Sequence, residues 1–375
     1  MTIDFISTLF QKLARLNWGI FFLILFIAAI GWGLLISAGG GDIHPWALKQ
    51  VIRFGVGVVI MFTLVLMDLR WWLHFSYFFY GISLFLLCGV EFLGFIGKGA
   101  ERWIDLYIIQ LQPSELMKIA LVMALARYFH SQIQPIPFRK LFVPCLMILA
   151  PMILCAKQPD LGTAMILLMV GGTLFFLAGV SLWYFGIALI GVGVSSPILW
   201  SFLHEYQKKR ILIFFDPSQD SLRSGYHITQ SKIALGSGGL WGKGYMQGTQ
   251  ASLNFLPEKQ TDFIFTLLCE EWGFMGGAFL LSLYLLLIVQ CFRIMLTTQN
   301  AFGRFVAAGM TMTFFLYVFI NIAMVMGLLP VVGVPLPLVS YGGTAMLTLL
   351  MGFGFLFNVS LHRTLKIPRL SIGVF

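Results

Sequence analysis

The sequence predicts an all-α polytopic membrane protein with about ten transmembrane helices, cytoplasmic termini, and one large extracytoplasmic loop between helices seven and eight. Of its 375 residues, 59% are hydrophobic and 10% are charged, and the mean hydropathy is +0.91. A soluble domain carries about 25% charged residues, whereas a spanning helix needs about 20 apolar residues. The composition therefore excludes an ordinary soluble globular protein.

Ten apolar runs mark the expected spans. They are Trp18–Ala38, Val51–Met67, Leu73–Val90, Leu116–Phe129, Leu141–Ala156, Leu161–Val180, Leu182–Leu203, Phe263–Phe292, Phe305–Leu329 and Leu336–Leu361. The fourth run is interrupted by two charges, Lys118 and Arg127. We expect residues 1–375 to form a single integral membrane domain.

Basic residues in the short connections set the expected orientation, because short cytoplasmic loops are rich in Lys and Arg. With ten spans, one side of the membrane receives Lys12, Arg15, Arg70, Arg127, Arg139, Lys140, Arg293, Arg304, Arg363, Lys366 and Arg369. The opposite short loops, Gly39–Pro45 and Leu329–Pro335, contain no Lys or Arg. The even number of spans and the charge bias therefore agree with each other.

The expected extracytoplasmic loop, residues 204–262, breaks this charge pattern. It contains Lys208, Lys209, Arg210, Arg223, Lys232, Lys243 and Lys259. Long loops cross the membrane despite positive charge, so this loop is either a solvated basic surface or a site for an anionic headgroup or phosphate. Within it, Tyr226–Leu235 has the pattern of a short amphipathic helix.

The cysteines and the N-terminus exclude other classes of protein. All five cysteines fall in apolar segments, and their odd number gives no disulfide framework. No metal-ligand spacing occurs, and nothing indicates nucleic acid as a partner. The first span lacks the pattern of a cleaved signal peptide, so we expect a retained helix.

Ionisable residues inside membrane spans are costly and usually face a cavity or each other. In QPSELMKIALVMALARYF, Pro113 and Ser114 predict a helix start, and Glu115 and Lys118 follow on one helical face. A structural ion pair and a direct role in substrate binding both fit this spacing.

In AKQPDLGTAM, Asp160 precedes an apolar run with Thr163 one turn on, which is the pattern of a helix N-cap. Capping alone would explain this aspartate. Lys157 beside it is either its partner or a phosphate ligand.

In LPEKQTDFIFTLLCEEWG, three acids enter an apolar segment. Thr261 or Asp262 could cap the eighth helix. Glu270 and Glu271 lie deeper, where a cap does not explain them. A polar cavity extending into the outer leaflet would explain them, and so would an interfacial position for the first turns.

Two further segments contain candidate residues. In KGAERWIDLY, Arg102 and Asp105 are interleaved with apolar residues, which suggests an interfacial amphipathic turn or a headgroup contact. The prolines of GLLPVVGVPLPLVSYGG predict extended or broken-helix geometry, tolerated at membrane depth only beside protein or a cavity. There Ser340 would present its hydroxyl, and Asn321 would hydrogen-bond a neighbouring helix.

Four motifs, QPSELMKIA, QPDLGTA, GYHITQSKIALGSGGLWGKGYMQGTQASLNFLPEKQTDFIF and GVPLPLVSYGG, together resemble the signatures of the SEDS family of bacterial cell-wall proteins. The match runs in order through nearly the whole chain, and the KGAERWIDL segment and the outer loop are most similar to the RodA branch. Trp272 and the triplet at 219–221 depart from the pattern without touching a motif carboxylate.

The resemblance implies a peptidoglycan glycosyltransferase in a bacterial inner membrane, with its active site facing outwards. It would polymerise lipid II into β-1,4 glycan during cell elongation and rod-shape maintenance, releasing undecaprenyl pyrophosphate. The implied partners are a class B penicillin-binding protein, other elongation-complex proteins and membrane lipids. A divalent cation, Mg or Mn, bridging the pyrophosphate to an acid is compatible with this chemistry.

The resemblance also implies roles for individual residues. Asp262, the motif acid of TDFIF, would be the general base on the acceptor hydroxyl. Glu115, Lys118 and Asp160 would line the cavity. Arg210, Arg102 and Lys243 are candidate phosphate ligands.

A lipid II flippase or secondary transporter is the competing interpretation, since ten spans, broken helices and intramembrane charges suit a transporter. No internal repeat relates the two halves, and Asp262 and the basic loop share one membrane face. A purely structural scaffold would leave the carboxylates unexplained.

Overall fold

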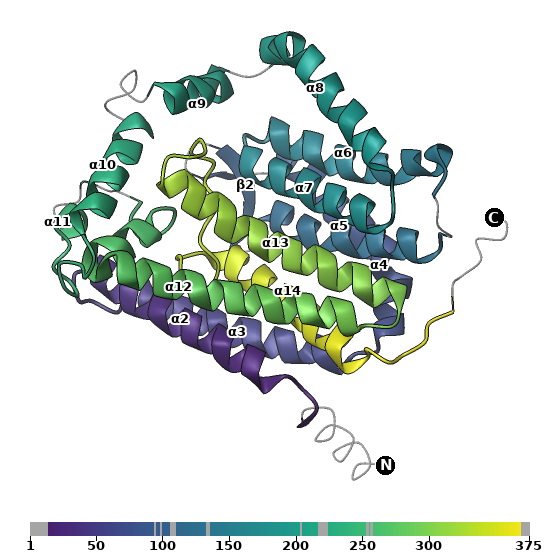
Figure 1. Cartoon of the computed structure of the whole chain (residues 1–375), viewed down its shortest axis with the longest axis horizontal. Coiled ribbons are helices and arrows are strands. Elements are labelled where there is room, and N and C mark those ends of the chain that lie inside the picture. Colours follow the sequence, from purple (N-terminus) through teal and green to yellow (C-terminus); the bar gives the residue numbers. More distant parts are fainter. Residues whose placement is uncertain are drawn as a thin grey trace.

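The computed structural model describes residues 14–93, 95–97, 100–105, 110–132, 136–202, 205–216, 224–252, 255 and 258–368. Its long helices are α2 (Trp18–Ala38), α3 (Ala47–Leu66), α4 (Leu69–Leu93), α5 (Pro113–His130), α6 (Phe142–Lys157), α7 (Leu161–Leu177), α8 (Leu182–Phe202), α12 (Ile264–Thr297), α13 (Ala301–Val325) and α14 (Gly343–Leu361). Each predicted apolar run overlaps one of these helices, although the tenth run was predicted to start at Leu336 and α14 starts only at Gly343. They run side by side in one bundle, from which α8 projects (Figure 1).

Seven candidate membrane spans occur in the described part of the chain, in α2, α3, α4, α6, α12, α13 and α14. α7 and the Leu182–Ile198 part of α8 are shorter apolar helices. The protein is therefore a mostly helical, multi-pass membrane protein. The start of α2 and the end of α14 lie at the same end of the bundle (Figure 1).

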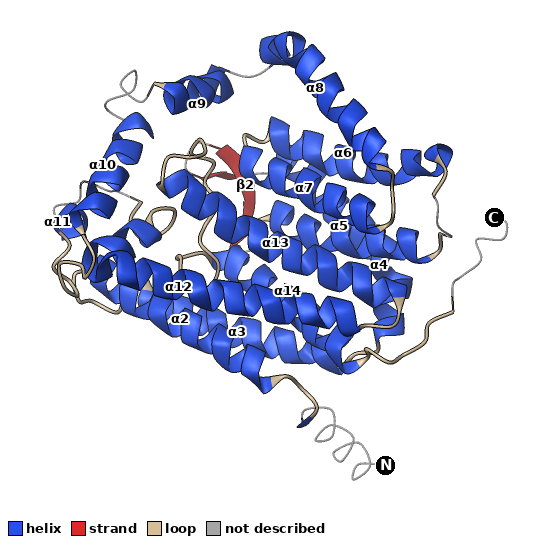
Figure 2. Cartoon of the chain, in the orientation of Figure 1, coloured by secondary structure: helices blue, strands red, loops and turns tan. Residues whose placement is uncertain are grey.

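Short elements connect the long helices. They are the 3-10 turn η1 (Phe138–Leu141), α9 (Glu205–Phe215), α10 (Ser224–Ser237) and α11 (Thr249–Ser252). α10 contains the predicted amphipathic segment 226–235. Figure 2 shows α9 and α10 arching beyond the bundle, from α8 towards the start of α12.

A three-stranded antiparallel sheet departs from the all-α expectation. Its strands are β1 (Phe95–Gly97), β2 (Ala100–Asp105) and β3 (Gln110–Leu111), in the order β1-β2-β3 (red in Figure 2). The predicted amphipathic turn in KGAERWIDLY is therefore wrong. The three-residue spacing of Arg102 and Asp105 suggested a helix, but Trp103 and Ile104 favour the alternating geometry of a strand.

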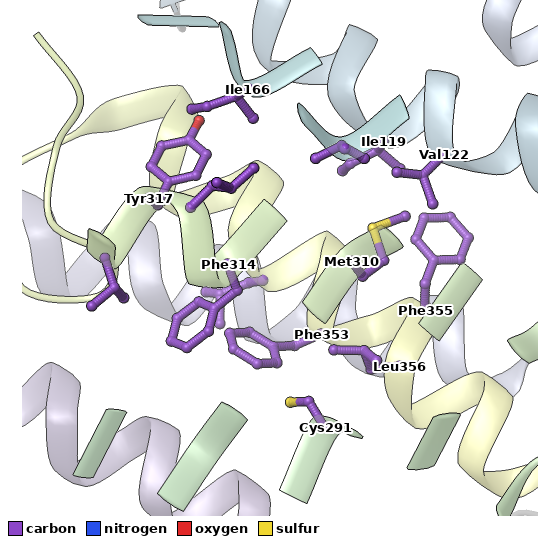
Figure 3. Packing of buried hydrophobic residues seen from close by; sticks show 14 of the residues in the cluster. Ile119, Val122, Ile166, Cys291, Met310, Phe314, Tyr317, Phe353, Phe355 and Leu356 are labelled. Carbon is purple, nitrogen blue, oxygen red and sulfur yellow. The ribbon is translucent and has the colours of Figure 1, made fainter. Parts of the chain in front are cut away.

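α5 and α13 form the buried centre of the bundle. Nearly every residue of α5 is buried, and α5 packs against α4, α6, α7 and α13. Of the two charges in the fourth run, Lys118 is therefore buried among protein groups, whereas Arg127 is partly buried and stacks on Tyr77. Figure 3 shows the core beneath this region, where Met310, Phe314 and Phe353 pack together.

The chain between α13 and α14 leaves the helical conformation, as its prolines predict. Residues 326–342 are non-helical, yet Val332, Val334, Leu336 and Val339 are buried. Such irregular backbone survives at membrane depth because protein satisfies its polar groups. For example, the Ser340 hydroxyl accepts from the Leu336 amide at 2.7 Å.

Candidate active site

A polar cavity of about 390 Å³ lies where the irregular segment, the start of α12 and the ends of several helices meet. Its charged lining residues are Glu115, Lys118, Asp160, Arg210, Glu258 and Asp262. These side chains come from α5, α7, α9 and the connection before α12. The folded chain thus gathers at one place charges that are up to about 150 positions apart in sequence.

The backbone around Asp262 is fixed from two sides. The Asn321 Nδ2 group donates to the carbonyls of Asp262 at 2.9 Å and Val334 at 2.8 Å. The Ser340 hydroxyl donates to the carbonyl of Thr261 at 2.6 Å. Neither Thr261 nor Asp262 caps α12, because the N-cap is Phe263, without a side-chain bond. The capping explanation is therefore wrong.

Gly333 leaves space in front of the Asp262 carboxylate. It lines the same cavity and has a φ of 74°, which only glycine adopts readily. A Cβ at this position would lie 3.7 Å from Asp262 Oδ2. The absence of a side chain at position 333 keeps one approach to the carboxylate open.

Glu115 and Lys118 form the predicted ion pair, with Lys118 Nζ 2.7 Å from Glu115 Oε1. The Tyr317 hydroxyl lies 2.7 Å from both carboxylate oxygens and also accepts from Lys118. Thr348 donates to Glu115 Oε2 at 3.1 Å. Figure 3 shows the Tyr317 hydroxyl pointing towards Ile166, another cavity residue.

Asp160 both caps a helix and lines the cavity. Its Oδ1 accepts from the Thr163 amide at 3.3 Å, which is the predicted N-cap of α7. Its Oδ2 accepts from Gln112 Nε2 at 3.2 Å and from the Ser114 hydroxyl at 3.3 Å. Capping alone is thus an incomplete account, since Asp160 also connects α7 to the start of α5.

Five other predicted residues lie outside this cavity's lining. Lys157 is an exposed residue at the end of α6, and Ser340 lies behind the cavity, where it holds the Thr261 backbone. Lys243, Glu270 and Glu271 cluster around the outer loop. A role for these five residues in substrate binding therefore stays a prediction. The side chain of Arg102 lies outside the described residues, although its neighbour Trp103 lines the cavity.

Glu270 and Glu271 hold the outer loop against α12. Glu270 Oε1 accepts from Lys243 Nζ at 2.7 Å and from the Gln250 amide at 3.0 Å. The backbone carbonyls of both glutamates accept from the amides of Lys243 and Gly244, each at 3.0 Å. Their depth in the sequence suggested a polar cavity or an interfacial position, and the structure places them against the outer loop, where Glu270 Oε1 and the two backbone carbonyls accept hydrogen bonds.

Sequence reasoning missed two residues beside the cavity. Arg53 of α3 stacks on Tyr341, with its guanidinium carbon 4.7 Å from the ring centroid. Its NH1 atom is buried without a hydrogen-bond partner. An arginine inside an apolar run is a sequence signal for a functional site. Nothing near Tyr317 in the sequence indicates its contact with Glu115, which lies 202 positions away.

Three helices begin at this cavity. The lining includes Gln112 before α5, Asp160 before α7, and Gly342 and Gly343 at the start of α14. Helix N-termini carry partial positive charge and unpaired N–H groups, which favour anions. The cavity therefore combines carboxylates with dipoles that attract negative charge.

Residues 13–365 match the cell cycle protein family of FtsW, RodA and SpoVE. The chain belongs to the FtsW/RodA/SpoVE family. Among relatives in this family, peptidoglycan glycosyltransferase MrdB of Escherichia coli K12 is 44% identical over 344 residues, which cover 91% of this chain and 93% of MrdB. Stage V sporulation protein E of Bacillus subtilis is 37% identical, covering 85% of this chain and 88% of that protein.

Solved structures of the family share the fold. A chain from a peptidoglycan synthase complex, solved to explain the coordination of polymerization and crosslinking, has a TM-score of 0.82 and 30% identity, covering 94% of this chain and 99% of that one. Thermus thermophilus rod shape determining protein RodA has a TM-score of 0.71 and 28% identity, covering 94% of this chain and 98% of that one. The matched FtsW/RodA/SpoVE region contains the whole cavity.

Proposed function

We propose that this protein polymerises lipid II into β-1,4 glycan at the polar cavity, with Asp262 as the general base. It is a peptidoglycan glycosyltransferase of the FtsW/RodA/SpoVE family that acts in cell elongation, as its MrdB and RodA relatives indicate. The observation that carries the proposal for the site is the placement of Asp262 in the cavity, beside the space left by Gly333.

In the proposed step, the Asp262 carboxylate takes the proton from the C4 hydroxyl of the acceptor N-acetylglucosamine. The hydroxyl oxygen then attacks the anomeric carbon of the donor, the bond to pyrophosphate breaks, and the configuration inverts. A positioned base of this kind contributes about 10²- to 10⁴-fold in rate. The clamp of Asn321 on the Asp262 backbone supports this role, because it limits where the carboxylate can lie.

The leaving pyrophosphate needs positive charge. Lys118 is already bound to Glu115, so we assign it to organising the cavity together with Asp160. Arg210 and the N-terminus of α14 are the better candidates for the phosphates, with Arg53 beside Gly343. No place in the cavity lining supports the same role for Lys157 or Lys243. The side chain of Arg102 lies outside the described residues.

A metal ion remains an expectation from the chemistry of pyrophosphate. Among the described residues, no group of three or more His, Cys, Asp or Glu side chains is positioned to hold one. Asp160 and Asp262 are the cavity acids to which a divalent cation carried by the substrate would bind. No step above depends on it.

We further propose ten spans, cytoplasmic termini and a cavity that faces the outside, as the charge bias of the loops predicts. The partner would be a class B penicillin-binding protein that cross-links the glycan. This partner is supported by the similarity to a chain from a peptidoglycan synthase complex.

The test uses purified protein with its cognate penicillin-binding protein and labelled lipid II in detergent, with glycan products resolved by gel. Asp262→Asn should lower polymerisation by at least about 10²-fold, whereas Asp42→Asn, the same change at an exposed residue of the loop between α2 and α3, should not. Detergent removes the two sides of the membrane, so lipid movement cannot appear as product. Near-normal polymer from Asp262→Asn would refute the assignment. No polymer from wild type, together with lipid II movement in vesicles, would identify a flippase.

A further inference from the structure

Four basic residues gather at the corner where the start of α4, the end of α5 and the start of α6 meet. They are Arg70, Arg127, Arg139 and Lys140. Two hydrogen bonds join the three elements there. Arg127 Nη1 donates to the His74 carbonyl of α4 at 2.5 Å, and the Tyr128 hydroxyl of α5 donates to the Lys140 carbonyl at 2.5 Å. We call these four residues the basic corner.

Protein carboxylates leave the charge of the basic corner uncompensated. Among the described residues, none of its four cations forms an ion pair. Asp68, the acid nearest to them in sequence, accepts the Arg70 backbone amide at 2.8 Å in the turn before α4. An anionic group that approached this corner would therefore meet net positive charge.

Arg127 is fixed in place and still has donors to offer. Its guanidinium carbon lies 4.4 Å from the centroid of the Tyr77 ring, and its bond to His74 uses one N–H group. A guanidinium has five N–H donors in a planar fork, which binds phosphate oxygens through two parallel hydrogen bonds. Arg127 precedes the end of α5 by three residues, about 4.5 Å along the axis. Its fork is therefore within reach of lipid phosphates.

An exposed aromatic stripe of α4 runs beside this arginine. Trp71, Phe75 and Phe78 follow at intervals of four and three residues, which places them on one helical face, and all three are exposed. The rings of Trp71 and Phe75 stack with centroids 4.9 Å apart. His74 and Tyr77, which contact Arg127, each precede one of these rings by one residue. The anchored cation thus lies next to a surface suited to acyl chains.

The turn before α6 combines cations and rings in the same way. Arg139 and Lys140 of η1 are exposed, and they lie between Phe138 and Phe142, each 66% exposed. Such a pattern suits the membrane interface, where rings enter the lipid and long cationic side chains stay with the headgroups. α4 and α6 pack against each other, so both sets of rings flank the same basic corner.

We propose that the basic corner binds the headgroup of an anionic phospholipid. The Arg127 fork binds the lipid phosphate, Arg139 and Lys140 add positive charge beside it, and an acyl chain lies along the aromatic stripe of α4. A zwitterionic phospholipid has the same phosphate but adds an ammonium, which the four cations repel. The exposed rings favour a lipid over an acidic peptide, because a peptide charge alone would leave them uncovered.

This site is separate from the polar cavity. In our proposed topology the basic corner meets the cytoplasmic leaflet, whose anionic lipids attract Lys and Arg close to the membrane. The polar cavity opens on the opposite side. Lipid binding here does not depend on the proposed chemistry at Asp262, so either proposal can fail while the other stands.

The test reconstitutes the full-length protein into nanodiscs that contain equal amounts of phosphatidylglycerol and phosphatidylethanolamine with the same acyl chains. The lipids that stay bound on transfer to detergent are counted by mass spectrometry. Each basic residue near a membrane surface contributes roughly fivefold to the affinity for a negative headgroup. Wild type should therefore retain phosphatidylglycerol at least about tenfold over phosphatidylethanolamine. Equal retention of the two lipids would overturn the proposal.

Matched double variants separate this corner from the general charge of the same membrane face. Arg139→Gln with Lys140→Gln removes two exposed cations and should abolish most of the preference. Arg363→Gln with Lys366→Gln removes two exposed cations after α14 and should keep it. An equal loss in both double variants would refute a site at the corner.

A single substitution tests the fork of Arg127. Arg127→Lys keeps the charge but loses the paired hydrogen bonds, so it should lower the preference about tenfold, as one charged hydrogen bond predicts. The competing occupant is an acidic protein segment. Equal retention of the two lipids, together with binding of a polyglutamate peptide that the Arg139 and Lys140 double variant loses, would assign the corner to such a segment and overturn the lipid site.

Discussion

The Glu115 carboxylate is an acceptor shared by α5, α13 and α14. Lys118, Tyr317 and Thr348 all donate to it, although Lys118 alone is its neighbour on the helix. In an apolar bundle the charges of this pair depend on each other. Removing one leaves the other buried without compensation, which is worse than removing both.

Glu115→Gln should therefore destabilise the protein by roughly 3–5 kcal/mol, the cost of breaking a buried pair. The matched control is Glu205→Gln, which breaks the pair with Lys208 at the same three-residue spacing, where the Glu205 side chain is 91% exposed. That exposed pair contributes about 0–1 kcal/mol. Thermal unfolding in detergent measures both variants, and equal shifts would show that burial of the pair contributes nothing.

Helix α12 is two helices joined end to end at Gly273. This glycine has a φ of 68° inside the element, and the outer loop lies directly against it. The amides of Phe274 and Met275 donate to the carbonyls of Gly239 and Leu240 at 2.9 and 3.1 Å. The break thus frees backbone amides of α12 from the helix, and these amides donate to the outer loop instead.

Gly273→Ala should detach the outer loop and leave the bundle folded. An alanine is strained at this φ, and its Cβ would lie 2.5 Å from the Leu240 carbonyl oxygen. Limited trypsin digestion should then cut faster at Lys243 and Lys259. Gly172→Ala is the control, since at that helical position an added Cβ would meet only Phe185 Cε1, at 4.0 Å. Unchanged digestion of Gly273→Ala would contradict this account of the break.

The elements show what local sequence patterns can predict. Apolar runs located the long helices, Pro113 and Asp160 marked helix starts, and the prolines of 330–337 marked the irregular segment, because each signal acts within a few residues. The start of α12 and the β2 strand were predicted wrongly, because tertiary contacts there outweigh the local signals of capping and residue spacing. The partners of Glu270, Arg53 and Tyr317 come from distant elements and have no local signature.

Across the whole molecule, helix N-termini and carboxylates meet at one end of the bundle. The starts of α5, α7 and α14 all reach the polar cavity. The start of α2 and the end of α14 lie at the other end (Figure 1). Our proposed topology therefore places the opening of the polar cavity on the extracytoplasmic side.

Cysteine labelling in intact cells tests this topology. In a background without the five native cysteines, His44→Cys, in the exposed loop after α2, should react with a membrane-impermeant maleimide. Gln299→Cys, exposed between α12 and α13, should react only after the cells are opened. The reverse pattern would invert the protein in the membrane and remove the proposed access to an external substrate.

The attachment of the outer loop to α12 has a mechanical consequence. Residues 239–244 contact the helix mainly through backbone amides and carbonyls. The joint therefore depends on glycine, because a Cβ at Gly242 would lie 2.1 Å from the Glu271 carbonyl oxygen. The eleven residues from Asp262 to Trp272 connect the attachment point of the loop to the Asp262 carboxylate. A displacement of the loop from outside would therefore reach the turns of α12 that follow Asp262, while Asn321 and Ser340 hold the Asp262 backbone in place.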